Sequence, residues 1–151
     1  MLNYDDHLTK NILFGESWST EVINGQEVKR QVPPDEEYIS EVIITAEDGQ
    51  IIRDKLNEVY GNSPKIGNRN KLNEIMLLIG SFWRSAVFQL YLYKTKQSTT
   101  TTGDHPKGKA IDLWTPRGMT PRQFYLFIKN KCNTRFNWFK VYKWGVHCSR
   151  R

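Results

Sequence analysis

The stretch GDHPKGKAIDLW, residues 103–114, places a histidine and an aspartate seven residues apart, next to an expected strand. Residues 109–114 alternate as a half-buried strand does, so Asp112 projects from one face while its apolar neighbours project from the other. Gly108 permits a tight backbone turn that would fold His105 back over Asp112. We therefore expect these two side chains to lie close together, as candidate ligands of a metal ion.

A third ligand has to come from elsewhere in the chain, and His147 is the candidate. It lies in an expected late strand, where Val146 and Cys148 point to the opposite face, so a thiol nucleophile paired with this histidine is not expected. Two histidines and one carboxylate around Zn²⁺ leave a fourth position for water, which is typical of a catalytic rather than a structural zinc site. The spacing alone is also that of a hydrogen-bonded loop without metal, and both interpretations stay open on the residues alone.

The rest of the chain predicts helices and strands in alternation. The expected order is a helix at 45–60 capped by Thr45, a strand at 73–80, a short helix at 85–94, a strand at 109–114, a helix from Thr120-Pro121 to Lys131, and two strands, or one bent at Gly145, at 138–149. This order fits a single α+β domain with a small antiparallel sheet flanked by helices. Residues 1–44 mix turn signals and aromatics, and predict an N-terminal arm or early hairpin packed on the domain of residues 45–151.

The composition predicts a folded chain without a membrane span. Of the 151 residues, 38% are hydrophobic and 13% aromatic, which is enough to fill a core. No apolar run approaches the ~20 residues that a spanning helix needs. Residues 1–10 lack the basic and apolar regions of a secretory signal, so we expect synthesis in the cytoplasm. Cys132 and Cys148 are expected to be free thiols, because nothing indicates an oxidising compartment.

Charge is distributed unevenly along the sequence. Nine of the 22 Lys and Arg residues follow Asp112, and none of the 16 Asp and Glu residues does. A positive C-terminal third favours an anionic partner such as a nucleic acid, an acidic polymer or a carboxylate-bearing peptide. An ordinary solvated basic face has the same composition, so charge alone does not choose a partner.

Three segments resemble one family of enzymes. HPKGKAID (105–112) matches the signature His-x-x-Gly-x-Ala-x-Asp of zinc peptidases that cleave the stem peptides of peptidoglycan. These are the D-alanyl-D-alanine carboxypeptidases and L-alanyl-D-glutamate endopeptidases, whose fold is shared with the Hedgehog signalling domain. SFWRSAVFQ (81–89) is similar to the family segment whose arginine meets a substrate carboxylate, and FNWFKVYKWGVHCS (136–149) resembles its closing strands. The resemblance covers roughly residues 45–149.

The resemblance implies a Hedgehog/DD-peptidase-like fold and a set of site residues. It implies that His105, Asp112 and His147 bind Zn²⁺, and that Arg84 holds a carboxylate of the peptide, a task that suits its planar guanidinium. The implied function is hydrolysis of peptide bonds in peptidoglycan stem peptides or cross-links, as in phage-encoded lysis of the cell wall. The protein would then reach the wall after release from the cytoplasm or as part of a virion.

One departure from the family concerns the general base. Many members carry Glu or Asp a few residues before the last histidine, whereas residues 141–146 contain neither. A base would have to come from earlier in the chain, where Asp104 and Glu16 are candidates, so the identity of the base stays open. General base help is typically worth 10²–10⁴-fold in rate, so its absence slows zinc chemistry without abolishing it.

Two other classes of function remain open. The fold can be kept as a non-catalytic structural or binding component, for example of a phage particle, with the missing acid as its trace. Alternatively, the aromatics of residues 138–144, interleaved with Lys140 and Lys143 and followed by two arginines, predict a nucleic-acid surface built on stacking and phosphate contacts. No nucleic-acid-binding motif accompanies them, so we place this alternative last.

Overall fold

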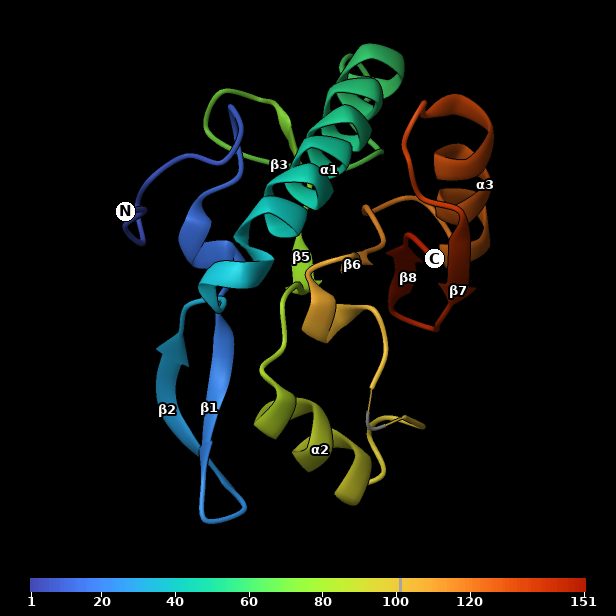
Figure 1. Cartoon of the computed structure of the whole chain (residues 1–151). Helices are drawn as coiled ribbons and strands as arrows, with labels where there is room; N and C mark the ends of the chain where they lie inside the picture. Colours follow the sequence, from blue (N-terminus) through green and yellow to red (C-terminus); the bar gives the residue numbers. More distant parts are fainter. Residues whose placement is uncertain (101) are drawn as a thin grey trace.

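The structure, a computed structural model, describes residues 1–100 and 102–151 (Figure 1). The described residues form the helices α1 (Ile39–Tyr60), α2 (Ala86–Lys94) and α3 (Pro121–Lys131) and three short 3-10 helices. Eight strands pair in three small antiparallel sheets. The fold is therefore of the α+β class with small antiparallel sheets and three α-helices, as the order of the sequence segments predicts.

The main sheet has four antiparallel strands and carries the site. Its order is β5 (Ile79–Ser81), β6 (Ala110–Trp114), β8 (Gly145–Ser149) and β7 (Trp138–Val141). Strand β6 lies inside the sheet, and its register with β8 pairs Asp112 directly with His147. The 138–149 segment is thus two strands joined as a hairpin, the first of the two alternatives stated above.

The core lies on one face of this sheet, between it and the helices. Figure 1 shows α1 passing close to β5, with α3 beside β7 and β8, and α1 also contacts β6. Along β6 the side chains of Ile111 and Leu113 are fully buried in the core, while Asp112 projects from the opposite face. The core cluster further includes Val42, Ile52 and Leu56 of α1, Phe124, Phe127 and Ile128 of α3, and Val146 and Cys148 of β8.

The N-terminal region is a hairpin followed by the start of α1. Strands β1 (Ser19–Ile23) and β2 (Gln26–Val32) turn at Asn24 and Gly25, both with positive φ, and Figure 1 shows this hairpin extending away from the main sheet beside α2. A further two-residue pair, β3 (Asn68–Arg69) with β4 (Ile75–Met76), lies near α1. No helix of the described residues is long and apolar enough to cross a membrane.

Two of the predicted elements are corrected by the structure. Helix α1 starts at Ile39, six residues before the predicted Thr45, so the predicted boundary between residues 44 and 45 falls inside it. Thr45 is fully buried in the helix and donates a hydrogen bond to the carbonyl of Gly108 at 2.6 Å instead of capping. The strand predicted at 73–80 is divided between β4 and β5, because its first half pairs with β3 and its second half with β6.

Other predicted features are confirmed. Helix α2 begins after Ser85, whose hydroxyl accepts a hydrogen bond from the Phe88 N–H at 3.1 Å. Helix α3 begins at Pro121 behind a Thr120 capping box. The two cysteines are free and buried, as expected.

Candidate metal centre

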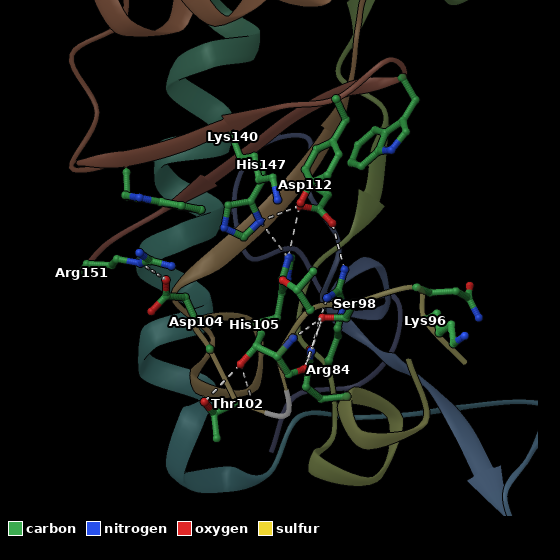
Figure 2. A pocket seen from close by; sticks show the side chains of 18 residues that line it. Arg84, Lys96, Ser98, Thr102, Asp104, His105, Asp112, Lys140, His147 and Arg151 are labelled. Atoms are coloured by element: carbon green, nitrogen blue, oxygen red, sulfur yellow. Dashed lines mark hydrogen bonds and ion pairs between the residues drawn. The ribbon is translucent and has the colours of Figure 1, made fainter. Parts of the chain in front are cut away.

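Three side chains converge on the sheet face opposite the core (Figure 2). The Nε2 atom of His105 lies 3.2 Å from Asp112 Oδ1 and 3.2 Å from His147 Nδ1, and His147 Nδ1 lies 2.9 Å from Asp112 Oδ1. A tetrahedral zinc ion with ligands at 2.0–2.1 Å holds them about 3.3 Å apart. The triangle of donor atoms therefore has nearly the size of one face of such a site, and the three predicted ligands can bind one metal ion.

The backbone explains why these residues meet. His105 begins a 3-10 turn, His105–Lys107, that ends at Gly108 with φ of 74°, the left-handed conformation expected there. A Cβ atom at Gly108 would lie 2.9 Å from Cγ2 of Val42 on α1, so the turn needs glycine for space as well as for conformation. The pairing of β6 with β8 then brings Asp112 and His147 side by side.

Contacts behind the ligands fix how they present their donor atoms. Nδ1 of His105 lies 2.5 Å from the carbonyl oxygen of Phe82, which can only accept a hydrogen bond. Nδ1 therefore carries the proton and the neutral ring presents its Nε2 lone pair to the centre, which is the usual arrangement behind a metal-binding histidine. The ring of His147 packs edge-on against Trp138, with 5.3 Å between ring centroids.

The electrostatics of the cluster favour the protonation states that a metal ion needs. Burial lowers the pKa of His105, which is only 4% exposed, so its imidazole is neutral at pH 7. Burial opposes ionisation of Asp112, but the neighbouring His105, His147 and Arg84 outweigh it and hold the pKa of this carboxyl well below its usual range. A neutral imidazole and an ionised carboxylate are the ligand forms that bind metal.

Arg84 lies in the same cluster and contacts Asp112, one of the three candidate ligands. Its Nη2 donates to Asp112 Oδ2 at 3.0 Å, its Nε donates to Ser81 Oγ at 3.0 Å, and its Nη1 donates to Gln89 Oε1 at 3.2 Å. The side chain is 16% exposed and lines the cavity at the centre. The structure thus brings together all four residues that the sequence predicts for the site.

The three ligands open into a cavity of about 660 Å³. Its described wall includes four cationic side chains, Arg84, Lys96, Lys140 and Arg151, and two acidic ones, Asp104 and the ligand Asp112. Trp138, Lys140 and Tyr142 alternate along and just beyond β7 and line the same cavity. The cavity is large enough for a short peptide and is richer in positive than in negative charge.

The two candidate bases occupy different places. Asp104 lines the cavity beside His105, and its Oδ2 accepts a hydrogen bond from Arg151 Nε at 3.1 Å (Figure 2). The Arg151 guanidinium also covers the Trp138 ring, 3.7 Å from its centroid. Glu16 lines a separate cavity of about 350 Å³, and its carboxylate accepts the Leu13 N–H at 2.7 Å. Among the described residues of the metal cavity, Asp104 is therefore the one carboxylate besides Asp112, and it is engaged by Arg151.

Sequence reasoning missed Gln89 and the carbonyl of Phe82. Gln89 is 1% exposed, and its Nε2 donates to Ser98 Oγ and to the Thr100 carbonyl, both at 2.9 Å. Its signal in the sequence is a single amide inside the apolar run SAVFQLYLYK. The Phe82 carbonyl has no sequence signal, because every residue provides the same backbone group.

Five residues of the predicted nucleic-acid surface line the metal cavity together: Trp138, Lys140, Tyr142, Trp144 and Arg151. Trp138 faces the metal cavity, whereas Phe139 packs against Tyr125 of α3, with 5.5 Å between ring centroids. Arg150 is held by the Glu41 carboxylate at 2.8 Å. Cys148 is fully buried on the core side of β8, as the alternation with His147 predicts. Phe139 and Arg150 are therefore engaged elsewhere, and the alternative of a nucleic-acid surface is limited to the side chains that line the cavity.

No family model, no curated protein and no solved structure matches this chain. The chemistry of the cluster is therefore the guide to function. Two imidazoles and one carboxylate at the bottom of a positively charged cavity can bind a divalent metal ion on three sides and leave its remaining side open to the cavity.

Proposed function

We propose that the protein is a zinc-dependent peptidase that hydrolyses peptide bonds in the stem peptides or cross-links of peptidoglycan, with a Hedgehog/DD-peptidase-like fold. The observation that carries this proposal is the triangle of His105, Asp112 and His147 donor atoms, 2.9–3.2 Å apart at the bottom of an open cavity. The resemblance of residues 105–112 to the peptidase signature supports the same ligands. Acting after lysis or as part of a phage particle fits this function.

The donor set fits zinc. Neutral imidazole and carboxylate are among the ligands that Zn²⁺ uses in catalytic sites, where three protein ligands leave one position for water or substrate. Zinc bound there would lower the pKa of its water to about 7 and polarise a peptide carbonyl. His105 and His147 would hold the ion through neutral ring nitrogens, and the Phe82 carbonyl would keep the His105 ring in the required tautomer.

The cavity supports an anionic peptide as substrate. Lys96, Lys140 and Arg151 line it together with Arg84, and a bound cation would add to their positive charge. Stem peptides carry free carboxylates, which such a cavity attracts. Asp104 lines the same cavity and is the candidate proton acceptor, and it would act only when released from Arg151.

A second candidate function follows from the contact between Asp104 and Arg151. The Asp104 carboxylate is bound by Arg151, so the described part of the cavity holds no unengaged acid. This arrangement favours a non-catalytic structural or binding component that keeps the metal site. Such a protein would bind zinc and leave purified cell walls intact.

A metal analysis combined with a muropeptide digest separates these functions. The peptidase should contain one zinc per chain and release cleaved peptides from purified peptidoglycan, as detected by mass spectrometry. Chelation and His147→Ala should abolish cleavage. His7→Ala is the matched control, because His7 is exposed and lies outside the cavity, and it should keep full activity. Stoichiometric zinc without cleavage at high enzyme concentration and long incubation would reject the peptidase and support the non-catalytic component.

A further inference from the structure

Arg84 contacts the metal cluster through one particular atom. The two oxygens of Asp112 are divided between different partners: Oδ1 faces both histidines, and Oδ2 accepts a hydrogen bond from Arg84 Nη2 at 3.0 Å (Figure 2). Asp112 is 5% exposed, so water does not readily replace these partners. The contact with Arg84 therefore determines which oxygen of Asp112 the metal ion meets.

Arg84 is itself held by two further elements. Ser81 on β5 accepts from its Nε, and Gln89 on α2 accepts from its Nη1. Gln89 is in turn fixed, because its amide nitrogen donates to Ser98 and to the Thr100 carbonyl in the segment that lines the cavity. Each of the three guanidinium nitrogens thus has a protein partner, and the planar group can turn only if several hydrogen bonds break together.

We infer that Arg84 is a positioning residue, which locks Asp112 so that Oδ1 alone binds the metal ion, and that Gln89 keeps Arg84 in place. This inference rests on the proposed zinc site, and it gives Arg84 a task other than the substrate contact that the resemblance implies. A carboxylate held through Oδ2 cannot rotate to bind the ion with both oxygens. One coordination position is thereby kept for water or substrate.

Charge repulsion and positioning predict opposite changes in zinc affinity when Arg84 is replaced. The guanidinium is a positive charge beside a site for a divalent cation, so charge repulsion alone predicts tighter metal binding when Arg84 is replaced by a neutral residue. Positioning predicts weaker binding, because loss of a partner behind a metal ligand typically costs 10–100-fold in affinity. The sign of the change therefore decides between the two.

The test is the zinc dissociation constant of the full chain, measured by competition with a chromophoric chelator. Arg84→Gln should weaken zinc binding by about 10–100-fold, and Arg84→Lys, which keeps the charge but loses the planar fork, should also weaken it. The matched control is Lys140→Gln, which removes a cavity cation whose ammonium group lies over the Tyr142 ring. Zinc binding by the control should stay equal or become tighter.

A second variant and a spectroscopic measurement distinguish lost positioning of Asp112 from misfolding of the Arg84 variants. Gln89→Met removes the support of Arg84 at similar volume and should weaken zinc binding in the same direction. Co²⁺ bound in place of zinc should show a visible spectrum that changes in Arg84→Gln, since coordination by both carboxylate oxygens alters the coordination number. Circular dichroism of the metal-free variants identifies any that fail to fold, and the comparison then uses those that do.

Equal or tighter zinc binding by folded Arg84→Gln would overturn the inference. A raised KM for carboxylate-bearing peptides with unchanged zinc affinity would also overturn it, and would assign Arg84 to the substrate. Failure of the proposed function is a separate result: wild-type protein that binds zinc but cleaves no peptidoglycan rejects the peptidase and leaves the positioning of Asp112 standing. Wild-type protein that binds no zinc rejects both.

Discussion

The buried carboxylate of Asp112 makes a quantitative prediction for the metal-free protein. In Asp112→Ala the guanidinium of Arg84, 16% exposed, loses its charged partner. Removing one member of a buried ion pair typically costs about 3–5 kcal/mol, because the other charge stays buried and unpaired. In a domain of this size each kcal/mol shifts Tm by about 2–4 °C, so Tm should fall by roughly 6–20 °C.

Urea denaturation in the presence of a chelator measures the loss of free energy of unfolding, and a thermal melt under the same conditions measures the fall in Tm, both followed by circular dichroism. Asp112→Asn keeps the volume and one acceptor oxygen, and should fall between wild type and Asp112→Ala. Asp5→Ala, at an exposed position, is the matched control and should change stability by less than about 0.5 kcal/mol. A loss below about 1 kcal/mol in Asp112→Ala would refute the reasoning, because it would mean that Arg84 finds water or another acceptor as readily as it finds Asp112.

Three further outcomes are expected. Zinc at 100 times its dissociation constant should raise the free energy of unfolding of wild type by about 2.7 kcal/mol, and a similar rise in His147→Ala, measured in the same urea titration, would contradict the assigned ligand. The pKa of Asp112 in the folded protein lies below its value in the unfolded chain, so its contribution to stability is present above pH ~4 and is lost as the pH falls below ~4. The urea midpoint of wild type should therefore decline below pH ~4. An equally steep decline in Asp112→Asn would show that another group is responsible. Gly108→Ala forces a side chain into a backbone with φ of 74° and against Val42, so it should cost more than about 1 kcal/mol and weaken zinc binding by displacing His105; a variant with wild-type melting and zinc affinity would reject this role for Gly108.

The metal cluster could be predicted from the sequence because its determinants are local. A period-two alternation, one glycine and a known preference of glycine for positive φ place His105 near Asp112. The pairing of Asp112 with His147 is non-local, yet it needs only that two antiparallel strands present one residue each to the same face. The ligand set therefore follows from short-range rules together with a resemblance over eight residues.

The environment of the cluster could not be predicted in this way. Local capping rules predict that α1 starts at Thr45, but the Thr45 hydroxyl binds the distant Gly108 carbonyl and does not cap the helix. Similarly, the contact of Arg84 with Asp112 joins residues 28 positions apart. Gln89 donates a hydrogen bond to Ser98, and no sequence pattern predicts that contact. Such contacts depend on how the elements pack, and packing routinely overrides local propensity.

The hairpin of β7 and β8 contributes one of the cationic side chains of the cavity, Lys140. Residues of alternating position on β7 face the metal cluster, and in this chain they are Trp138 and Lys140, followed by Tyr142 beyond the strand. The basic bias seen in the sequence after Asp112 is thus partly delivered to the site itself, where an acid would be expected in the family that the sequence resembles. A lysine in register with His147 repels a bound cation and attracts a carboxylate, so this hairpin favours binding of an anionic substrate over proton removal. If the protein is the proposed peptidase, its proton acceptor would have to come from outside this hairpin, where Asp104 is held by Arg151, and activity would depend on breaking that ion pair.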